Sequence, residues 1–87
     1  MIELSDEVDG QPYEILEPIL NLLLENGNEI KTDYRWGSNP TGYFCILTKD
    51  IDFELVEKTF KLPCSVQLMR KYGSIDYGLG TAIIRSA

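Results

Sequence analysis

The sequence predicts a single α+β domain built from two αββ units, which together form a four-stranded antiparallel sheet with two helices on one face. Apolar residues recur first at helical and then at alternating spacing, and this change of period occurs twice along the chain. The 87 residues fit one domain, spanning residues 1–87, and leave no room for a second independent core. In addition, several positions 36 residues apart carry matching residue types.

The first helix is predicted over 18–26. Apolar side chains recur at helical spacing at Ile15, Leu16, Ile19, Leu20, Leu23 and Leu24. Pro18 is tolerated in the first turn of a helix but disrupts its interior, so we expect the helix to begin there. Gly27 is placed to end it, since glycine readily adopts the left-handed conformation of a helix C-terminus.

A hairpin is predicted to follow. Polar and apolar residues alternate over 30–36, which is typical of a strand with one exposed face. Residues 37–42 are rich in turn formers, and 43–48 form a continuous β-prone run. The sequence therefore predicts two antiparallel strands joined by a short turn.

The second unit is predicted to repeat this order. Asp50 or Asp52 can cap a helix over 53–61, which ends before Pro63. Alternation over 66–72 predicts a third strand, and the composition of 73–78 is typical of a turn leading to a last strand over 81–85. The expected element order is therefore αββαββ.

An offset of 36 residues aligns the two units as possible pseudo-repeats, 15–49 and 51–85. Gly37-Ser38 then matches Gly73-Ser74, and Trp36 matches Tyr72. Two αββ units share one apolar pattern in any case, so the match favours duplication without establishing it.

The sheet order follows from the connections. A right-handed crossover through the second helix makes the second and third strands parallel, so the last strand fits antiparallel between them. The first and third strands alternate like edge strands, and the order becomes 1-2-4-3. This is a permuted ferredoxin-like sandwich. The alternative is that Ile2 to Leu4 add a further strand.

Charge is distributed unevenly along the chain. Residues 1–30 hold eight acidic residues and no Lys or Arg, whereas the remainder carries all eight bases. An acidic segment repels phosphate, so nucleic-acid binding is disfavoured. The acidic residues near the N-terminus, Asp6, Glu7 and Asp9, are candidates for contact with a basic protein partner. The simpler interpretation is that these acids keep a small protein soluble.

Nothing in the sequence indicates a catalytic or metal site. The chain has no histidine, which excludes imidazole catalysis and histidine-ligated metals. Cys45 and Cys64 lack the cationic setting of a reactive thiolate and the paired spacing of a zinc site, so we expect two reduced cysteines, no metal and no cofactor. Enzymatic activity stays open, with binding favoured over catalysis.

Two functions are compatible with these features. The first is a non-catalytic protein-interaction module, such as a small acidic inhibitor or antitoxin-like protein, or a self-associating accessory protein. The alternative is a small-molecule or ligand-binding domain that uses aromatic and basic residues of the sheet, for which the pocket candidates are Arg35, Trp36, Arg70 and Tyr72.

The interaction hypothesis predicts an exposed apolar sheet face. Neighbouring residues of a strand point to opposite faces, so only one of Ile83 and Ile84 can enter the core. With Met69 nearby, the other is expected to lie on a surface that binds a second copy, giving a homodimer, or another protein. No apolar run approaches the roughly 18 residues of a membrane span, and the acidic N-terminus does not resemble a signal peptide, so a cytoplasmic location is expected.

Overall fold

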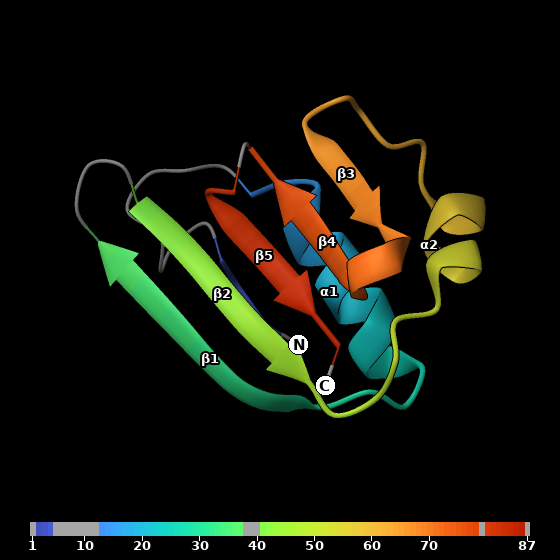
Figure 1. Ribbon diagram of the computed structural model, residues 1–87, viewed down its shortest axis with the longest axis horizontal. Helices are drawn as coiled ribbons and strands as arrows, with labels where there is room; N and C mark the ends of the chain where they lie inside the picture. Colours follow the sequence, from blue (N-terminus) through green and yellow to red (C-terminus); the bar gives the residue numbers. More distant parts are fainter. Residues whose placement is uncertain (1, 5–12, 38–40, 79, 87) are drawn as a thin grey trace.

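The structure, a computed structural model, describes residues 2–4, 13–37, 41–78 and 80–86 and consists of two helices and one five-stranded mixed sheet (Figure 1). The elements in chain order are α1 (Leu16–Glu25), β1 (Ile30–Gly37), β2 (Thr41–Leu47), α2 (Phe53–Thr59), β3 (Val66–Met69), the 3-10 helix η1 (Arg70–Tyr72), β4 (Ser74–Tyr77) and β5 (Ala82–Arg85). The strand order is β1-β2-β5-β4-β3. Neither helix of the described chain is long and apolar enough to span a membrane.

The predicted α+β class is confirmed, but the four-stranded antiparallel sheet and the permuted ferredoxin-like arrangement are wrong. The segment expected to be one turn, 73–78, contains strand β4, which pairs antiparallel with both β3 and β5. One added antiparallel strand reverses the direction of the strand after it. As a result β5 runs parallel to β2, where an antiparallel neighbour was expected.

Glycine conformation explains how β4 forms inside a glycine-rich segment. Gly73 and Gly78 have φ values of 63° and 59°, in the left-handed region. Gly73 reverses the chain after η1, and Gly78 leads out of β4. The two glycines therefore mark the ends of a short strand, rather than lying within a single turn.

The helices are not both layered on the sheet. In Figure 1, α1 lies behind the central strands, whereas α2 lies beside the β3 edge of the sheet. The buried residues of α1 join the core, and α2 contributes Val56. The predicted pair of helices on one face is thus corrected to one covering helix and one helix at the edge.

Helix α1 begins two residues earlier than predicted. Pro18 is its third residue. The N–H groups in the first turn of a helix have no acceptor within the helix, so proline, which has no N–H, loses no hydrogen bond at this position. The helix ends as expected near Gly27, whose φ is 97°. Residues 2–4 do not form the additional strand considered above. They lie along α1, where Asn21 accepts from the Ile2 N–H (2.8 Å) and donates to the Ile2 carbonyl (3.2 Å).

The second helix confirms the predicted cap. The Asp52 carboxylate accepts a hydrogen bond from the Leu55 N–H at 3.1 Å, and the helix ends before Pro63. Its seven residues are fewer than the nine expected over 53–61.

The core lies between α1 and the sheet. Its strand residues come from β2, β3, β4 and β5, and all are buried: Tyr43, Cys45, Leu47, Val66, Ile75, Ala82 and Ile84. They pack with the buried residues of α1, which are Leu16, Ile19, Leu20 and Leu23. The other face of these strands is covered by no described helix, and this uncovered face defines the molecule's candidate functional surface.

The two expected pseudo-repeats do not contain the same elements. The first unit is α1, β1 and β2, whereas the second is α2, β3, η1, β4 and β5. At the offset of 36 residues, the segment that joins β1 to β2 aligns with strand β4. The predicted order αββαββ is therefore wrong in its second half, and common ancestry of the halves stays a prediction.

Candidate interaction surface

The sheet face turned away from α1, called the open face below, follows from strand register. Residues paired across a sheet have side chains on the same face, and these alternate along each strand. Because Tyr43, Cys45 and Leu47 enter the core, Phe44 and Ile46 lie on the open face. The complete set is Thr32, Tyr34 and Trp36 on β1, Phe44 and Ile46 on β2, Ile83 and Arg85 on β5, Ser74 and Asp76 on β4, and Gln67 and Met69 on β3.

Aromatic side chains occupy the β1 side of the open face. The rings of Tyr34 and Trp36 lie 5.7 Å apart between centroids and are tilted by 32°. The indole of Trp36 covers Gly42 on β2 so closely that an added Cβ would clash with the ring. Glycine at position 42 therefore allows the indole to lie flat against the strand, which extends the aromatic surface across both strands.

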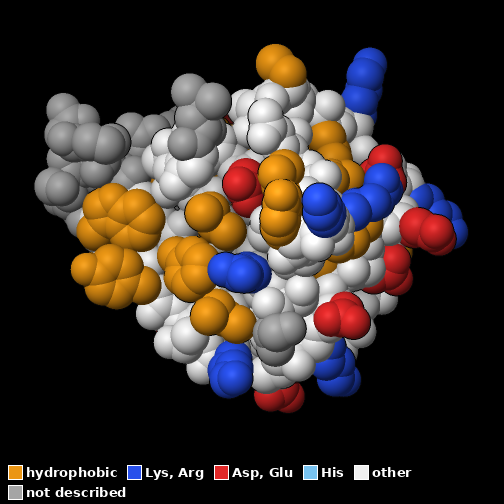
Figure 2. Space-filling view, in the orientation of Figure 1, with side chains coloured by type: hydrophobic (Ala, Val, Ile, Leu, Met, Phe, Trp, Pro, Cys, Tyr) orange, Lys and Arg blue, Asp and Glu red, His pale blue; other side chains and the backbone are white. Residues whose placement is uncertain are grey.

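A shallow hollow of about 230 Å³ follows at the centre of the open face. Phe44, Ile83 and Met69 supply its apolar lining, and Tyr72 of η1 projects at its border with 61% of its surface exposed. In Figure 2, viewed onto this face, hydrophobic side chains gather over β1, β2 and β5, with Lys and Arg side chains among them. The open face is thus an apolar strip that crosses several strands, larger than the isolated apolar residues normal on a surface.

The charged groups of this face are mostly cationic. Arg85 borders the central hollow and also lines a second hollow of about 350 Å³ together with Lys31 and Tyr72. Lys71 lies with its ammonium 5.9 Å from the Tyr72 ring centroid. Among the described residues that line the face, the acidic one is Asp76, whose carboxylate accepts a hydrogen bond from the Ser74 hydroxyl at 3.1 Å. The face therefore combines apolar area with a cationic border.

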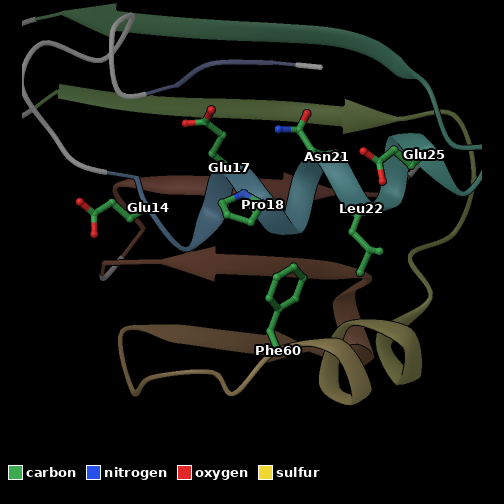
Figure 3. A pocket seen from close by; sticks show the side chains of 7 residues that line it. All are labelled: Glu14, Glu17, Pro18, Asn21, Leu22, Glu25 and Phe60. Atoms are coloured by element: carbon green, nitrogen blue, oxygen red, sulfur yellow. The ribbon is translucent and has the colours of Figure 1, made fainter.

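The opposite side of the molecule carries a larger and more acidic groove. It has a volume of about 540 Å³ and runs along the outer surface of α1 (Figure 3). Glu14, Glu17 and Glu25 line it, and Phe60 points toward Leu22 from the segment after α2. Glu17 also accepts a hydrogen bond from the Leu4 N–H at 3.3 Å, so part of this acidic set is used to hold the N-terminal segment.

The Cys, Asp and Glu side chains of the described residues form no cluster that could hold a metal ion. Both cysteines are free thiols, Cys45 buried and Cys64 exposed. Burial raises the pKa of Cys45 to about 11, which keeps it protonated at neutral pH and unsuited to nucleophilic attack.

The predicted interaction residues lie on different surfaces. Ile83 and Met69 are partly exposed on the open face, whereas Ile84 is fully buried in the core. One of the two isoleucines therefore enters the core, as side-chain alternation requires. The acidic candidates Asp6, Glu7 and Asp9 lie outside the described residues.

The four predicted pocket residues do not converge. Tyr72 lines both hollows of the open face, whereas Trp36 lines neither. Arg35 points to the other face, with its guanidinium 5.3 Å from the Tyr43 ring centroid. Arg70 forms an ion pair with Glu57 and lies over Phe53.

Two charged residues of the open face were missed by sequence reasoning. Arg85 lies two positions after Ile83, so strand alternation alone could have placed both on one face. Asp76 could not be placed in this way, because its strand was taken for a turn.

Comparisons of this chain with protein-family models, with curated proteins and with solved structures found no match.

Proposed function

We propose that this protein is a non-catalytic interaction module that binds a partner protein with the open face of its sheet. The observation that carries the proposal is the apolar strip formed by Trp36, Phe44, Ile46 and Ile83, which the helices of the described chain leave uncovered. Covering apolar surface of this kind is the main favourable term in protein association.

The charged side chains around this strip indicate what kind of partner surface can bind it. Among the described residues, Lys31, Lys71 and Arg85 border the strip, and Asp76 is the carboxylate that lines it. Two copies packed face to face would bring these cations toward each other. A different protein, with apolar side chains surrounded by Asp or Glu, would pair with them instead. We therefore propose that the open face binds a different protein, whose apolar contact surface is bordered by Asp or Glu. This replaces the homodimer packed through the same face that was one expectation from the sequence.

The alternative of a small-molecule pocket receives less support. The two hollows on this face are open, and the four side chains expected to form a pocket lie apart. Ligand sites usually enclose most of their ligand's surface. A basic partner for the acidic N-terminal segment and a cytoplasmic location remain predictions from the sequence.

The proposal is tested with the chain's single tryptophan as the reporter. Proteins captured from source-cell extract on the immobilised chain are purified and titrated against it while Trp36 fluorescence is followed. Phe44→Asp places a charge in the strip and is expected to weaken binding at least tenfold, about 1.4 kcal/mol. The control Thr59→Asp adds the same charge on the exposed side of α2 and should bind like wild type. The proposal fails if every captured protein binds the two variants equally well.

A further inference from the structure

Strand β1 forms one edge of the sheet, and no described helix or strand lies beyond it (Figure 1). Such an edge presents backbone N–H and C=O groups to any chain that can pair with it. Native proteins often protect edges by keeping them short or interrupting them. At eight residues β1 is twice as long as the other edge strand, β3, which has four.

The residues that face outward can be identified from one hydrogen bond. The Tyr43 N–H donates to the Thr81 carbonyl at 3.0 Å, so Tyr43 directs its backbone groups toward β5. Its partner in β1, Arg35, is then in a non-hydrogen-bonded pair and directs its own N–H and C=O outward. The N–H and C=O groups of successive residues in a strand point alternately to its two sides, so those of Asp33, two residues before Arg35, also point outward. Tyr34, between them, pairs with Phe44 of β2.

The regular part of this edge has a defined centre. A bulge interrupts the register with β2 between Ile30 and Thr32, and Gly37 is the last residue of the strand. The uninterrupted stretch from Thr32 to Trp36 is therefore centred on Tyr34. With 64% of its surface exposed, Tyr34 is the most exposed of the large hydrophobic residues described.

We propose that two copies of this chain pair antiparallel through β1, with Tyr34 on the two-fold axis, and so join their sheets into one of ten strands. In this register Asp33 of each copy lies opposite Arg35 of the other, and each such pair can exchange two backbone hydrogen bonds. The carboxylate and guanidinium share the α1 side of the sheet, where opposite charges across a pair are favourable.

The charges select this register over its neighbours. Centring the pair on Asp33 places two aspartates opposite each other, and centring it on Arg35 opposes two arginines, which is destabilising in both cases. Of these three registers, only the one centred on Tyr34 makes both charge pairs favourable. A pair centred on Thr32 would also oppose unlike charges, but it would run through the bulge between Ile30 and Thr32. It also stacks Tyr34 on its symmetry mate and places Trp36 across from Thr32, on the open face.

This dimer uses a different surface from the proposed partner site, and it leaves both open faces accessible on the same side of the joined sheet. The dimer would thus present two partner sites side by side. Because the edge and the open face are separate, either proposal can fail without the other.

The test uses charge complementation, followed by sedimentation velocity up to about 1 mM protein. In a dimer of Asp33→Arg, the new arginine of each copy would face Arg35 of the other. In a dimer of Arg35→Asp, the new aspartate would face Asp33. Each variant alone should therefore dimerise at least about tenfold more weakly than wild type. An equimolar mixture of the two should form a heterodimer, because each arginine of one chain then faces an aspartate of the other. A charge pair within one chain cannot produce this rescue. Asp50→Arg and Lys58→Asp change the net charge equally at exposed positions elsewhere and should dimerise like wild type.

Arg35 packs over Tyr43, so its replacement could unfold the monomer. Amide hydrogen exchange on the wild-type protein gives an independent measurement. The amides of Asp33 and Arg35 should become more protected as concentration rises, whereas that of Tyr34, directed into the sheet, should be protected throughout. The proposal is overturned if wild type is monomeric at about 1 mM, if a dimer forms with Asp33 and Arg35 amides still exchanging freely, or if folded single variants dimerise as wild type does.

Discussion

At the scale of single residues, the side chains of Tyr43 and Cys45 belong to the packed core on the inner face of the sheet. Both are fully buried. The Tyr43 hydroxyl is 3.5 Å from an Asp33 carboxylate oxygen, to which it donates. Burial, together with the neighbouring Cys45 and Asp33, raises the pKa of Tyr43 well above its usual range. The Tyr43 hydroxyl and the Cys45 thiol are therefore both neutral in the folded protein at neutral pH.

This burial predicts a loss of stability at alkaline pH. The pKa of the Cys45 thiol rises from 9.0 to about 11 on folding, so between these values the unfolded chain releases a proton that the folded chain keeps. The unfolded state then binds fewer protons, and the free energy of unfolding must fall as pH rises through this window. Below pH 9 the contribution is fully present.

The measurement is urea denaturation of wild type and Cys45→Val from neutral pH to about pH 11. The valine variant has no thiol to ionise, so its stability should decline less steeply. Equal slopes for the two proteins would show that Cys45 ionises as easily in the folded state as in the unfolded one.

At the scale of elements, strand β4 decides the topology, and Gly73 makes β4 possible. Its φ of 63° turns the chain from η1 into the strand, and its carbonyl accepts from both the Ser86 N–H (2.8 Å) and the Ser86 hydroxyl (2.9 Å). An added Cβ would clash with that hydroxyl oxygen. The start of β4 and the end of β5 are thereby fastened together.

Gly73→Ala is expected to destabilise the fold more than Gly80→Ala. Both glycines have positive φ, so each alanine carries roughly 1 kcal/mol of backbone strain. Only the alanine at position 73 also meets Ser86, since the space around Gly80 is open. Thermal unfolding of the two variants should therefore show the lower midpoint for Gly73→Ala, and equal midpoints would contradict the proposed role of the Gly73–Ser86 contact.

The sequence predicted most elements but not the sheet they form. Periodicity placed both helices and the strands β1, β2, β3 and β5, because each has a clear apolar pattern and, for α2, a cap at Asp52. The third strand was expected over 66–72, but β3 ends at Met69 and η1 follows it. Strand β4 was missed because its four residues are too few to show alternation and lie between two glycines typical of turns. Each antiparallel strand reverses the direction of the chain. Because β4 was not predicted, the last strand was expected to run antiparallel to β2, whereas β5 runs parallel to it.

At the scale of the whole molecule, the two sides of the protein differ in chemistry. The groove along α1 carries three glutamates, whereas Lys31, Lys71 and Arg85 border the apolar open face. Strand alternation predicted that one of Ile83 and Ile84 would be exposed, but it could not say which, because that depends on which face α1 covers. The sequence also could not bring Arg85 and Tyr72 together, since they lie on different elements that meet only in the folded sheet.

The most direct test of the open-face interaction compares Ile83→Asp with Ile84→Asp, which differ by one position and by the face they occupy. Ile84 is fully buried, so a carboxylate there should unfold the domain, at a cost of several kcal/mol. Ile83 lies on the open face, so Ile83→Asp should keep the wild-type circular dichroism spectrum and lose affinity for the partner at least tenfold. If both variants unfold alike, or if folded Ile83→Asp binds the partner as tightly as wild type, the open face is not the interaction surface.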